Sequence, residues 1–513
     1  MKLFSTEQIK EIDHYTIEHE GITSLDLMER AALACVARIS KLVSSEEEVR
    51  VFCGKGNNGG DGLAITRLLR ERGFNATAFV INYTETFSPD AETNYQVLKK
   101  KFPEALSDLN NSSELLSLPK NTNCVVLDAL LGTGLSKPVE GFLGEVISFL
   151  NNSPCRIISI DMPSGLYVDK CSVKNTSIIR SSLCLSFQFP KLSFLLPENG
   201  LYVPEFEILD IGLSEKKIQE TSSNYYYLTK KDIAYLLKKR AKFSHKGTYG
   251  HALLLAGSKG KSGAALIASK ACLRSGAGLL TLQSTKDTIT ALHSYLPEAM
   301  SREDAHDDYL SELKDPQDVD AICFGPGVGT QEDTQNVLKK LLQYYHGKLV
   351  LDADGLTILS ENKTWLTFLP PAAILTPHPK EFERLTEKAT DDYEKLQILK
   401  QFSLKFNCIV ILKGAHTCIA MPDGNLFFNS SGNAGLAKGG SGDGLSGILL
   451  GLLTRGYSAP QVALIGTFVH GYAADLCAKE YSLESILISD VIEQIPMAFK
   501  DLEMQQVSHW TRL

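Results

Sequence analysis

The chain has 513 residues, of which 43% are hydrophobic and 22% charged, ordinary values for a folded protein that exclude a wholly disordered or fibrous chain. Its 52 basic and 60 acidic side chains leave a net charge of −8. The chain therefore has no overall attraction for nucleic acid or an anionic membrane, and any anion site must be built locally. At roughly 100–200 residues per domain, the length predicts two large domains.

Neither the apolar segments nor the cysteines of the sequence indicate a membrane protein or an oxidising compartment. The first 21 residues lack a basic head followed by an apolar core, and no apolar run reaches the roughly 20 residues of a membrane helix. The eleven cysteines are scattered and form no CxxC pair. We expect reduced, buried, structural thiols in a soluble cytoplasmic protein.

Short β-like runs alternate with helical stretches along the whole chain, which predicts the α/β class. Continuous apolar runs such as HALLLA and CIVIL are typical of strands buried on both faces of a mostly parallel sheet. The expected strands are, in chain order, Val49–Cys53, Ala76–Ile81, Cys124–Asp128, Arg156–Asp161, Ser182–Phe187, Ala252–Ala256, Gly278–Gln283, Asp320–Phe324, Lys348–Asp352, Ala373–Thr376 and Cys408–Leu412.

A polar stretch, Leu213–Ser223, separates the two halves and is almost free of large apolar residues. Such segments are typical of domain boundaries. We therefore expect one domain over residues 1–215, a linker over 216–228 and a second domain over 229–505.

The first motif with chemical content is a glycine-rich turn between a strand and a helix, at Gly54–Asp61. Glycines allow a tight turn, and a helix N-terminus favours anions. This turn also carries Asn57, Asn58 and Asp61, whose oxygen atoms are the ligands that hard cations prefer.

Two further strands of the first half end in the same way. Asp128 ends one strand before the loop Gly132–Pro138, and Asp161 ends another before a turn with Ser164. Because the carboxyl ends of parallel strands share one edge, we expect these side chains to converge on a ligand. The alternative for any single one of them is a helix cap or a turn.

The strings GKGNNGGDGL, LDALLGTGL, SIDMPSGL and FQFPK together resemble the NAD(P)H-hydrate epimerase domain. The resemblance implies a Rossmann-like, three-layer fold and interconversion of the 6R and 6S hydrates of NADH and NADPH. It implies a potassium ion bound by Asn58, Asp128 and Ser164. The residues it places against the hydrate are Asn57, Asn58, Gly59, Gly60, Asp61, Gly132, Thr133, Gly134, Leu135, Ser136, Lys137, Pro138 and Asp161.

Epimerisation at the carbon that carries the hydroxyl moves protons whether the hydroxyl leaves or the ring opens, so it needs a general acid and base. Asp161 is the candidate for this role. Lys191 of FQFPK is a candidate for stabilising negative charge or for carrying the second proton. The alternative for Lys191 is a surface lysine that follows a strand.

In the second half, the segment of residues 432–453 is the most informative. Gly439, Gly440, Ser441 and Gly442 precede Asp443 and an apolar helix. Glycine N–H groups at a helix start can hold phosphoryl oxygens. A carboxylate in such an anion site is unfavourable unless it takes part in the reaction. Kinase aspartates do so when they deprotonate the attacking hydroxyl. The alternative is a simple helix cap. The arrangement is similar to the ribokinase superfamily.

Within that superfamily, AGSKGKSGAA, GPGVG, DADGL, LTPHPKE, LKGAHT and GNAGLAKGGSGD resemble ADP/ATP-dependent NAD(P)H-hydrate dehydratase. The resemblance implies a ribokinase-like α/β fold with ADP or ATP as co-substrate and small-molecule substrates. Phosphate chemistry, which needs a divalent ion to bridge oxygen atoms, implies Mg²⁺, and we expect a homo-oligomer. It places Ala264, Gly327 and His378 on the hydrate, and Asp443 beside the hydroxyl as catalytic base. The residues it places on the adenine nucleotide are Lys413, Gly414, Ala415, His416, Thr417, Gly432, Asn433, Lys438, Gly439, Gly440, Ser441 and Gly442, with His416 expected to be exposed.

The resemblance implies a kinase-like reaction in which the hydroxyl is phosphorylated and phosphate is then expelled by the ring nitrogen, with ADP preferred. Two alternatives stay open. One is a ribokinase-type kinase for a vitamin-like alcohol fused to a sugar-nucleotide-type Rossmann module. The other is a pair of nucleotide-sensing domains without catalysis.

Overall fold

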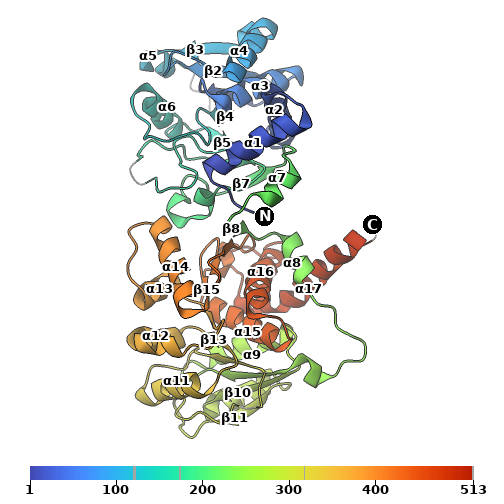
Figure 1. Ribbon diagram of the computed structural model, residues 1–513, viewed down its shortest axis with the longest axis vertical. Helices are drawn as coiled ribbons and strands as arrows, with labels where there is room; N and C mark the ends of the chain where they lie inside the picture. The colour runs from blue at the N-terminus through green and yellow to red at the C-terminus, as the bar shows by residue number, and fades with distance from the viewer. Residues whose placement is uncertain (119–122, 173–174, 317, 511–513) are drawn as a thin grey trace. The chain divides into compact units, whose positions relative to one another are not determined.

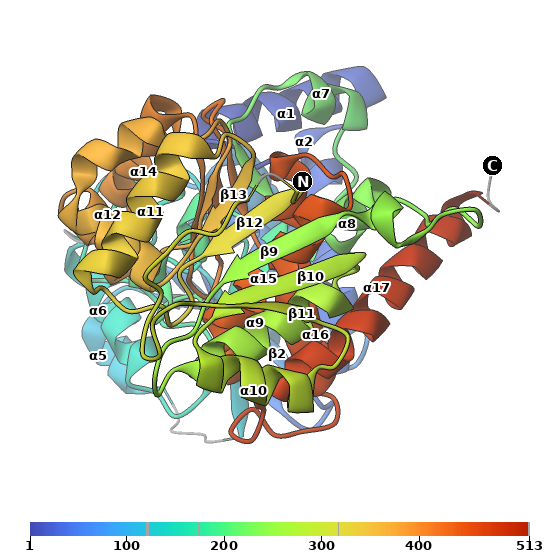
Figure 2. The same ribbon diagram turned by 90° about the horizontal axis from the view of Figure 1, so that it is seen from below.

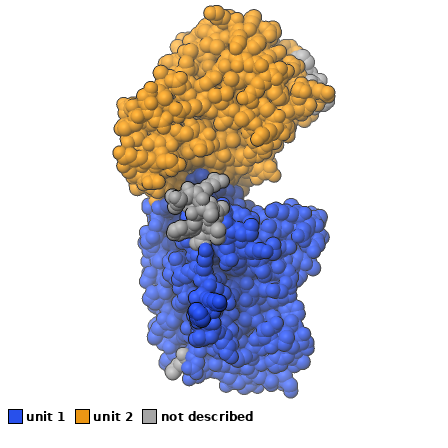
Figure 3. Space-filling model, turned by 90° about the vertical axis from the view of Figure 1, so that its right-hand side faces the viewer, with its two compact units in different colours: residues 1, 224–390, 394–513 blue, residues 2–223, 391–393 orange. Residues whose placement is uncertain are grey.

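The computed structural model describes residues 1–118, 123–172, 175–316 and 318–510. Two compact units can be distinguished in it (Figure 3). The N-terminal unit comprises residues 2–223 and 391–393, and the C-terminal unit comprises residue 1, 224–390 and 394–513. No helix among the described residues has the length and apolar character needed to cross a membrane.

The described part of the N-terminal unit is built on a seven-stranded sheet in which every neighbouring pair is parallel. The strand order is β3-β2-β1-β4-β5-β6-β7, the doubly wound order of a Rossmann-like fold. The strands are β1 Glu48–Cys53, β2 Ala76–Ile81, β3 Leu106–Leu109, β4 Cys124–Ala129, β5 Arg156–Ile160, β6 Leu183–Phe187 and β7 Phe206–Leu209. The helices are α1 Thr6–Glu20, α2 Ser24–Leu42, α3 Asn57–Glu71, α4 Pro89–Lys101, α5 Ser112–Leu116, α6 Gly141–Asn151 and α7 Glu215–Glu220.

Helices cover both faces of this sheet. Val51 of β1 belongs to a core with α2, α3 and α4, whereas its neighbour Phe52 belongs to a second core with α5 and α6. Successive side chains of a strand point to opposite faces, so the two cores lie on opposite sides of the sheet. The N-terminal unit therefore has three layers, which its ribbon also shows (Figure 1).

The C-terminal unit contains a ten-stranded sheet in the order β11-β10-β9-β12-β13-β14-β15-β16-β17-β8. It is parallel from β11 to β15, and β16 pairs antiparallel with both of its neighbours. The strands are β8 Tyr225–Tyr227, β9 His251–Leu255, β10 Leu279–Ser284, β11 Met300–Glu303, β12 Ala321–Phe324, β13 Lys348–Leu351, β14 Ile374–Leu375, β15 Ile409–Leu412, β16 Cys418–Ala420 and β17 Leu426–Phe428. The helices are α8 Lys230–Leu236, α9 Ser262–Arg274, α10 Lys286–Tyr295, α11 Glu332–Tyr344, α12 Asp354–Glu361, α13 Pro379–Leu385, α14 Asp392–Phe406, α15 Ser441–Thr454, α16 Ala459–Cys477 and α17 Ile488–Trp510.

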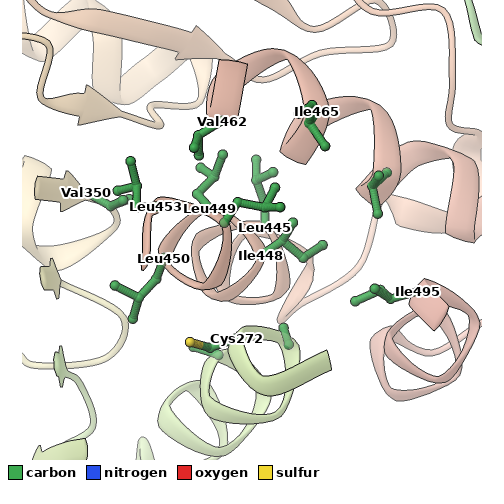
Figure 4. Close-up of a cluster of buried hydrophobic side chains, with 14 of the residues drawn as sticks. Cys272, Val350, Leu445, Ile448, Leu449, Leu450, Leu453, Val462, Ile465 and Ile495 are labelled. Carbon is green, nitrogen blue, oxygen red and sulfur yellow. The ribbon is translucent and has the colours of Figure 1, made fainter. Parts of the chain in front are cut away.

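Helices again lie on both sides of this sheet, with α11 and α12 on one side and α9, α15 and α16 on the other (Figure 2). Helix α15 is apolar on all sides and buried from Gly444 to Thr454. Its leucines and its one isoleucine, Ile448, point towards α9, α16 and β13 (Figure 4). A Cβ at Gly447 or Gly451 would lie 2.2 and 2.3 Å from backbone oxygens of α9, so only glycine permits this approach. The packing fixes the N-terminus of α15, and with it Asp443.

The α/β class is confirmed, and all eleven expected strands are present within one or two residues of their expected bounds. Six described strands, β3, β7, β8, β11, β16 and β17, were not expected. All six are three or four residues long. The edge strands β3, β7, β8 and β11 are only partly buried, whereas β16 and β17 are largely buried but too short to give a long apolar run. The segment expected as linker contains most of α7, followed by β8. Along the chain, the boundary between the two units falls between Ser223 and Asn224.

The cysteine prediction is wrong for one pair. Cys124 and Cys155 form a disulfide at the amino ends of the neighbouring parallel strands β4 and β5. Adjacent parallel strands bring two residues 31 positions apart side by side, which their spacing in sequence does not reveal. The other nine cysteines are free, and all of them except Cys171 are buried.

Candidate active sites

A cavity of about 920 Å³ lies at the carboxyl edge of the N-terminal sheet. It brings together most of the residues that the epimerase resemblance selected, although they come from three separate segments. Those lining it are Asn57, Asn58, Asp61, Gly132, Thr133, Gly134, Leu135, Ser136, Lys137, Pro138 and Asp161.

The glycine-rich turn is shorter than expected, because α3 begins at Asn57 and its first turn already contains Asn58–Asp61. Gly59 and Gly60 face away from the cavity. A Cβ at Gly59 would lie 1.8 Å from the carbonyl oxygen of Gly54, and one at Gly60 would lie 2.8 Å from Sδ of Met28. These two glycines let α3 pack closely on the sheet and on α2.

The three residues expected to bind potassium are linked through the loop after β4. The Asp128 carboxylate is fully buried and accepts hydrogen bonds from Ser164 Oγ at 2.5 Å, Ser164 N at 2.9 Å and Ser159 Oγ at 2.8 Å. Ser164 Oγ also accepts a hydrogen bond from the backbone N–H of Leu131. Burial raises the pKa of Asp128, and these hydrogen bonds oppose the shift.

Asn58 completes this group. Asn58 is 7% exposed and packs against Gly132, because a Cβ atom added to Gly132 would lie 3.2 Å from the Cβ of Asn58. Neither its amide oxygen nor its amide nitrogen has a hydrogen-bond partner among the described residues. A buried amide without a partner is costly, and a bound cation coordinated by Oδ1 would remove the part of that cost that belongs to the oxygen atom. The oxygen donors of Asn58, Asp128 and Ser164 therefore fit an alkali cation.

Asp161 and Lys191 form a buried ion pair, with Lys191 Nζ 2.6 Å from Asp161 Oδ1. The alternative of a surface lysine is wrong, since Lys191 is 1% exposed. Its ammonium also donates to Ser186 Oγ and to the carbonyl oxygens of Phe187 and Phe189. Lys191 does not line the cavity, so it holds Asp161 from behind. Asp161 has a φ of 63°, a backbone conformation that aims its side chain out of the strand direction.

The sequence did not point to two further cavity residues, Lys10 and Asp13 of α1. Burial first, and then the charge of Asp161, raise the pKa of Asp13 to about 7, while Lys191 acts in the opposite direction. Burial and the charges of Asp161 and Asp13 also raise the pKa of Asp61. Lys10 and Asp13 lie in a plain helical segment without a glycine motif, so nothing in the local pattern marks them.

In the C-terminal unit, Asp443 lies in the first turn of α15, directly after the glycines. Gly440 precedes the helix with a φ of 89°, a conformation that favours glycine. Burial and the neighbouring charges of Asp352 and Asp354 raise the pKa of Asp443 to about 6, although Lys413 lowers it. Asp443 is thus a carboxylate poised to gain or lose a proton near neutral pH.

Asp352, directly after β13, holds the polar side chains at this corner of the sheet. Its carboxylate is 1% exposed, accepts from Lys413 Nζ at 3.0 Å and from Ser446 Oγ at 2.7 Å, and has a lowered pKa despite its burial because Lys413 and these hydrogen bonds favour the ionised form. Lys413 Nζ also lies 3.3 Å from where a Cβ of Gly442 would be. The ammonium therefore stands beside the glycine turn.

A cavity of about 490 Å³ adjoins this corner. Of the residues expected on the nucleotide, Lys413, Gly414, Ala415, Thr417, Gly432 and Asn433 line it. His416 does not, and the expectation that it is exposed is wrong: it is partly buried near the carbonyl of Asn429, and burial lowers its pKa. Lys438 is held by the carbonyl oxygens of Glu484 and Ile486. Asp475, which the sequence did not indicate, accepts from Gly432 N and Asn433 Nδ2 and so fixes that loop.

Helix α16 presents two buried polar atoms at this second cavity, Thr467 Oγ1 and His470 Nε2. Neither has a hydrogen-bond partner among the described residues. Burial and the charge of Lys413 lower the pKa of His470 to about 4, so its ring is neutral at pH 7. Threonine and histidine three positions apart in an apolar helix were the available signal in the sequence. A ligand with polar groups would satisfy both.

The residues expected on the hydrate lie around the same sheet edge. Ala264, in the first turn of α9, and Gly327 are in contact, since a Cβ on Gly327 would lie 3.1 Å from Cβ of Ala264. His378 caps α13, where its Nδ1 accepts from the backbone N–H groups of Lys380 and Glu381. The preceding residue, Pro377, accepts a hydrogen bond from Lys413 N, which connects this turn to the Asp352 corner.

The chain is thus a two-site α/β protein, with one carboxylate-lined cavity beside a cluster of side-chain oxygen atoms and one glycine-led helix start beside a second cavity. Residues 24–193 match the family described as YjeF-related protein N-terminus, and residues 252–497 match NAD(P)H-hydrate dehydratase. A bifunctional NAD(P)H-hydrate repair enzyme of Moorella thermoacetica is 32% identical over 523 residues, covering 98% of this chain and 97% of that protein. The enzyme of the same name from Coxiella burnetii is 32% identical, with 96% and 98% covered.

Among solved structures, ADP/ATP-dependent NAD(P)H-hydrate dehydratase of Bacillus subtilis, co-crystallised with ATP and Mg²⁺, is 33% identical with a TM-score of 0.48. The match covers 55% of this chain and all of that one. On the full-length similarity of its relatives, the chain belongs to the family of bifunctional NAD(P)H-hydrate repair enzymes.

Proposed function

We propose that this chain repairs hydrated nicotinamide cofactors. The N-terminal unit interconverts the 6R and 6S hydrates of NADH and NADPH, and the C-terminal unit dehydrates the 6S form at the expense of ADP or ATP, which gives AMP or ADP and phosphate. The observation that carries the proposal is Asp443, a titratable carboxylate held at the start of a rigid buried helix beside Lys413 and a nucleotide-sized cavity.

In the dehydratase unit, Asp443 takes the proton of the C6 hydroxyl as that oxygen attacks the terminal phosphoryl group. The N–H groups at the start of α15 and the ammonium of Lys413 stabilise the phosphoryl charge. The phosphorylated intermediate then loses phosphate as the lone pair of the ring nitrogen N1 forms a C6=N1 bond. Loss of a proton from C5 to water then forms the C5=C6 double bond and returns the electron pair to nitrogen, which regenerates NADH or NADPH. Asp352 keeps Lys413 in place, and Ala264, Gly327 and His378 are proposed to hold the hydrate.

The adenine nucleotide is proposed to occupy the 490 Å³ cavity, where Thr467 and His470 gain the partners that they lack. Among the residues that the structure describes, no group of three or more His, Cys, Asp or Glu side chains forms a metal site. We therefore propose that Mg²⁺ is held mainly by the phosphates, where it supplies charge neutralisation.

In the epimerase unit, Asp161 exchanges the protons that accompany removal and return of the hydroxyl, and Lys191 positions it. Asn58, Asp128 and Ser164 are proposed to hold K⁺, which supplies positive charge at the cavity edge. The unpartnered amide of Asn58 supports this assignment.

The test is incubation of the purified chain with a mixture of hydrated NADH epimers and either ADP or ATP, in K⁺ and in Na⁺ buffers. We expect NADH absorbance to recover until both epimers are consumed, faster in K⁺ for the 6R part and with ADP preferred to ATP. Recovery that stops when the 6S form is exhausted would refute the epimerase assignment. Phosphoryl transfer from the nucleotide to a stable phosphorylated product would indicate the kinase alternative, and no turnover would indicate the pair of binding domains.

A further inference from the structure

The epimerase cavity needs a second proton-carrying group besides Asp161. When a hydroxyl leaves one face of the ring and water returns to the other, one group must donate a proton and another must accept one. Lys191 cannot touch the substrate, because it is 1% exposed, does not line the cavity and donates to four oxygen atoms behind Asp161.

Asp13 is placed where such a group is required. It lies on α1, an element separate from the sheet edge that carries Asp161, and both residues line the same cavity. Ile12 beside it is fully buried, which anchors the helix, whereas Asp13 is only partly buried. Across the described ranges, no side chain or backbone N–H donates a hydrogen bond to the Asp13 carboxylate, so it is available to a ligand.

We propose that Asp13 is the second acid–base residue of the epimerase, opposite Asp161 across the bound hydrate, and that Lys191 is a positioning residue for Asp161. This inference rests on the proposed function of the N-terminal unit.

The step balances as follows. The C6–O bond breaks, its electron pair leaves with the oxygen, and that oxygen takes the proton of the Asp13 carboxyl to depart as water, while the ring nitrogen's lone pair forms a C=N bond. A water on the other face then forms the new C6–O bond, Asp161 takes its proton, and the C=N pair returns to nitrogen. One proton has moved from Asp13 to Asp161, and epimerisation in the reverse direction or exchange with cavity water returns it.

The charges around Asp13 support this pairing. The groups that face it are Lys10 on its own helix, Asp61 of α3, Asp161 after β5 and Lys191 behind it, with Lys137 and Glu140 on the loop of the same cavity. Burial and Asp161 bring the pKa of Asp13 to about 7, where a carboxyl can both give and take a proton at neutral pH. Asp161, ion-paired with Lys191, is the complementary base.

The experiment compares three variants of the full chain with the unmodified protein: Asp13→Asn, Asp13→Glu, and Glu11→Gln as a matched control on the same helix, with a side chain 65% exposed. Epimerisation is followed by chromatography of purified 6R hydrate, and dehydration of purified 6S hydrate with ADP is measured on each preparation to verify its folding. We expect Asp13→Asn to lower the epimerisation kcat by about 100- to 10,000-fold with little change in KM. Glu11→Gln should have no effect, and Asp13→Glu should retain part of the rate.

The pH profile provides a readout that a structural role would not change. The unmodified protein should show a titration near pH 7 in the epimerisation rate, and the residual rate of Asp13→Asn should lack it. A kcat within about tenfold of normal for Asp13→Asn, or an Asp13→Glu variant as inactive as Asp13→Asn, would overturn the proposal. If the unmodified protein itself does not epimerise the hydrate, the proposed function fails rather than this assignment of Asp13.

Discussion

Replacing Asp443 with asparagine should abolish dehydration and at the same time stabilise the C-terminal unit at neutral pH. The residue lies in the first turn of α15, partly buried, with its pKa raised to about 6 from the ordinary 3.8. Because the folded-state pKa lies above the unfolded value, the contribution of Asp443 to the free energy of unfolding is greatest below about pH 4. It declines as the pH rises through about 6. At pH 7 the folded protein therefore bears the cost of an ionised, partly desolvated carboxylate.

The size of that cost follows from the shift. A displacement of about two pKa units corresponds to about 3 kcal/mol at 1.36 kcal/mol per unit, and this net value already includes every interaction of the charge in the folded protein. Asp443→Asn should thus raise the free energy of unfolding at pH 7 by about 3 kcal/mol and change it little at pH 4. The same pKa predicts that dehydration by the unmodified protein falls about tenfold between pH 7 and pH 5, as the base becomes protonated.

Urea unfolding at pH 4 and pH 7 measures the free energy of unfolding. Recovery of NADH absorbance measures the rate of dehydration, and calorimetric titration measures the affinity for ADP. We expect turnover to drop by about 100- to 10,000-fold while ADP binding survives or tightens. The control is Asp287→Asn, an exposed acid in the first turn of α10, which should slightly destabilise the protein and leave dehydration unchanged. A destabilised Asp443→Asn variant with normal turnover at saturating ADP would show that Asp443 is a helix cap, and the catalytic role would be refuted.

Three further predictions follow from the remaining contacts. Asp128→Ala should remove the K⁺ dependence and most of the epimerase activity, because it deletes a central oxygen donor, while dehydration of 6S hydrate continues; both rates are measured in K⁺ and Na⁺ buffers. Lys191→Met should lower the free energy of unfolding of the N-terminal unit by about 3–5 kcal/mol, since it leaves Asp161 without its buried partner, as urea titration would show. Thr467→Val should raise the KM for ADP by roughly 2- to 10-fold through loss of one hydrogen bond, with the KM for the hydrate unchanged in the dehydration assay.

Each of these has a control within the chain. Equal loss of both activities in Asp128→Ala would contradict the independence of the two sites. The double variant Lys191→Met with Asp161→Asn should regain part of the lost stability, and no regain would show that the ion pair is not the cause. Ser269→Ala removes another buried hydroxyl without a described partner, but one that does not line the nucleotide cavity, so a similar KM change there would refute the role of Thr467.

The sequence by itself determined what local patterns encode. Continuous apolar runs identified the central strands, since a strand buried on both faces must be apolar throughout, and glycine-rich strings identified the turns at the carboxyl edges. The same strings selected Asn58, Asp161 and Asp443, because a polar or charged residue directly after a buried strand or a glycine turn stands out from its surroundings.

Tertiary structure alone decided which distant residues meet. The edge strands are short and partly exposed, so only their pairing with a neighbour defines them. The sequence left open whether Lys191 carries a proton or lies at the surface, and only the fold showed that it is buried. Cys124 meets Cys155 only because β4 and β5 are adjacent. Asp13 and His470 lie in helices without a glycine motif, where the hydrophobic periodicity predicts only which face of the helix packs against the core. Which cavity the other face meets depends on contacts between segments far apart in the chain, and these carry no local pattern.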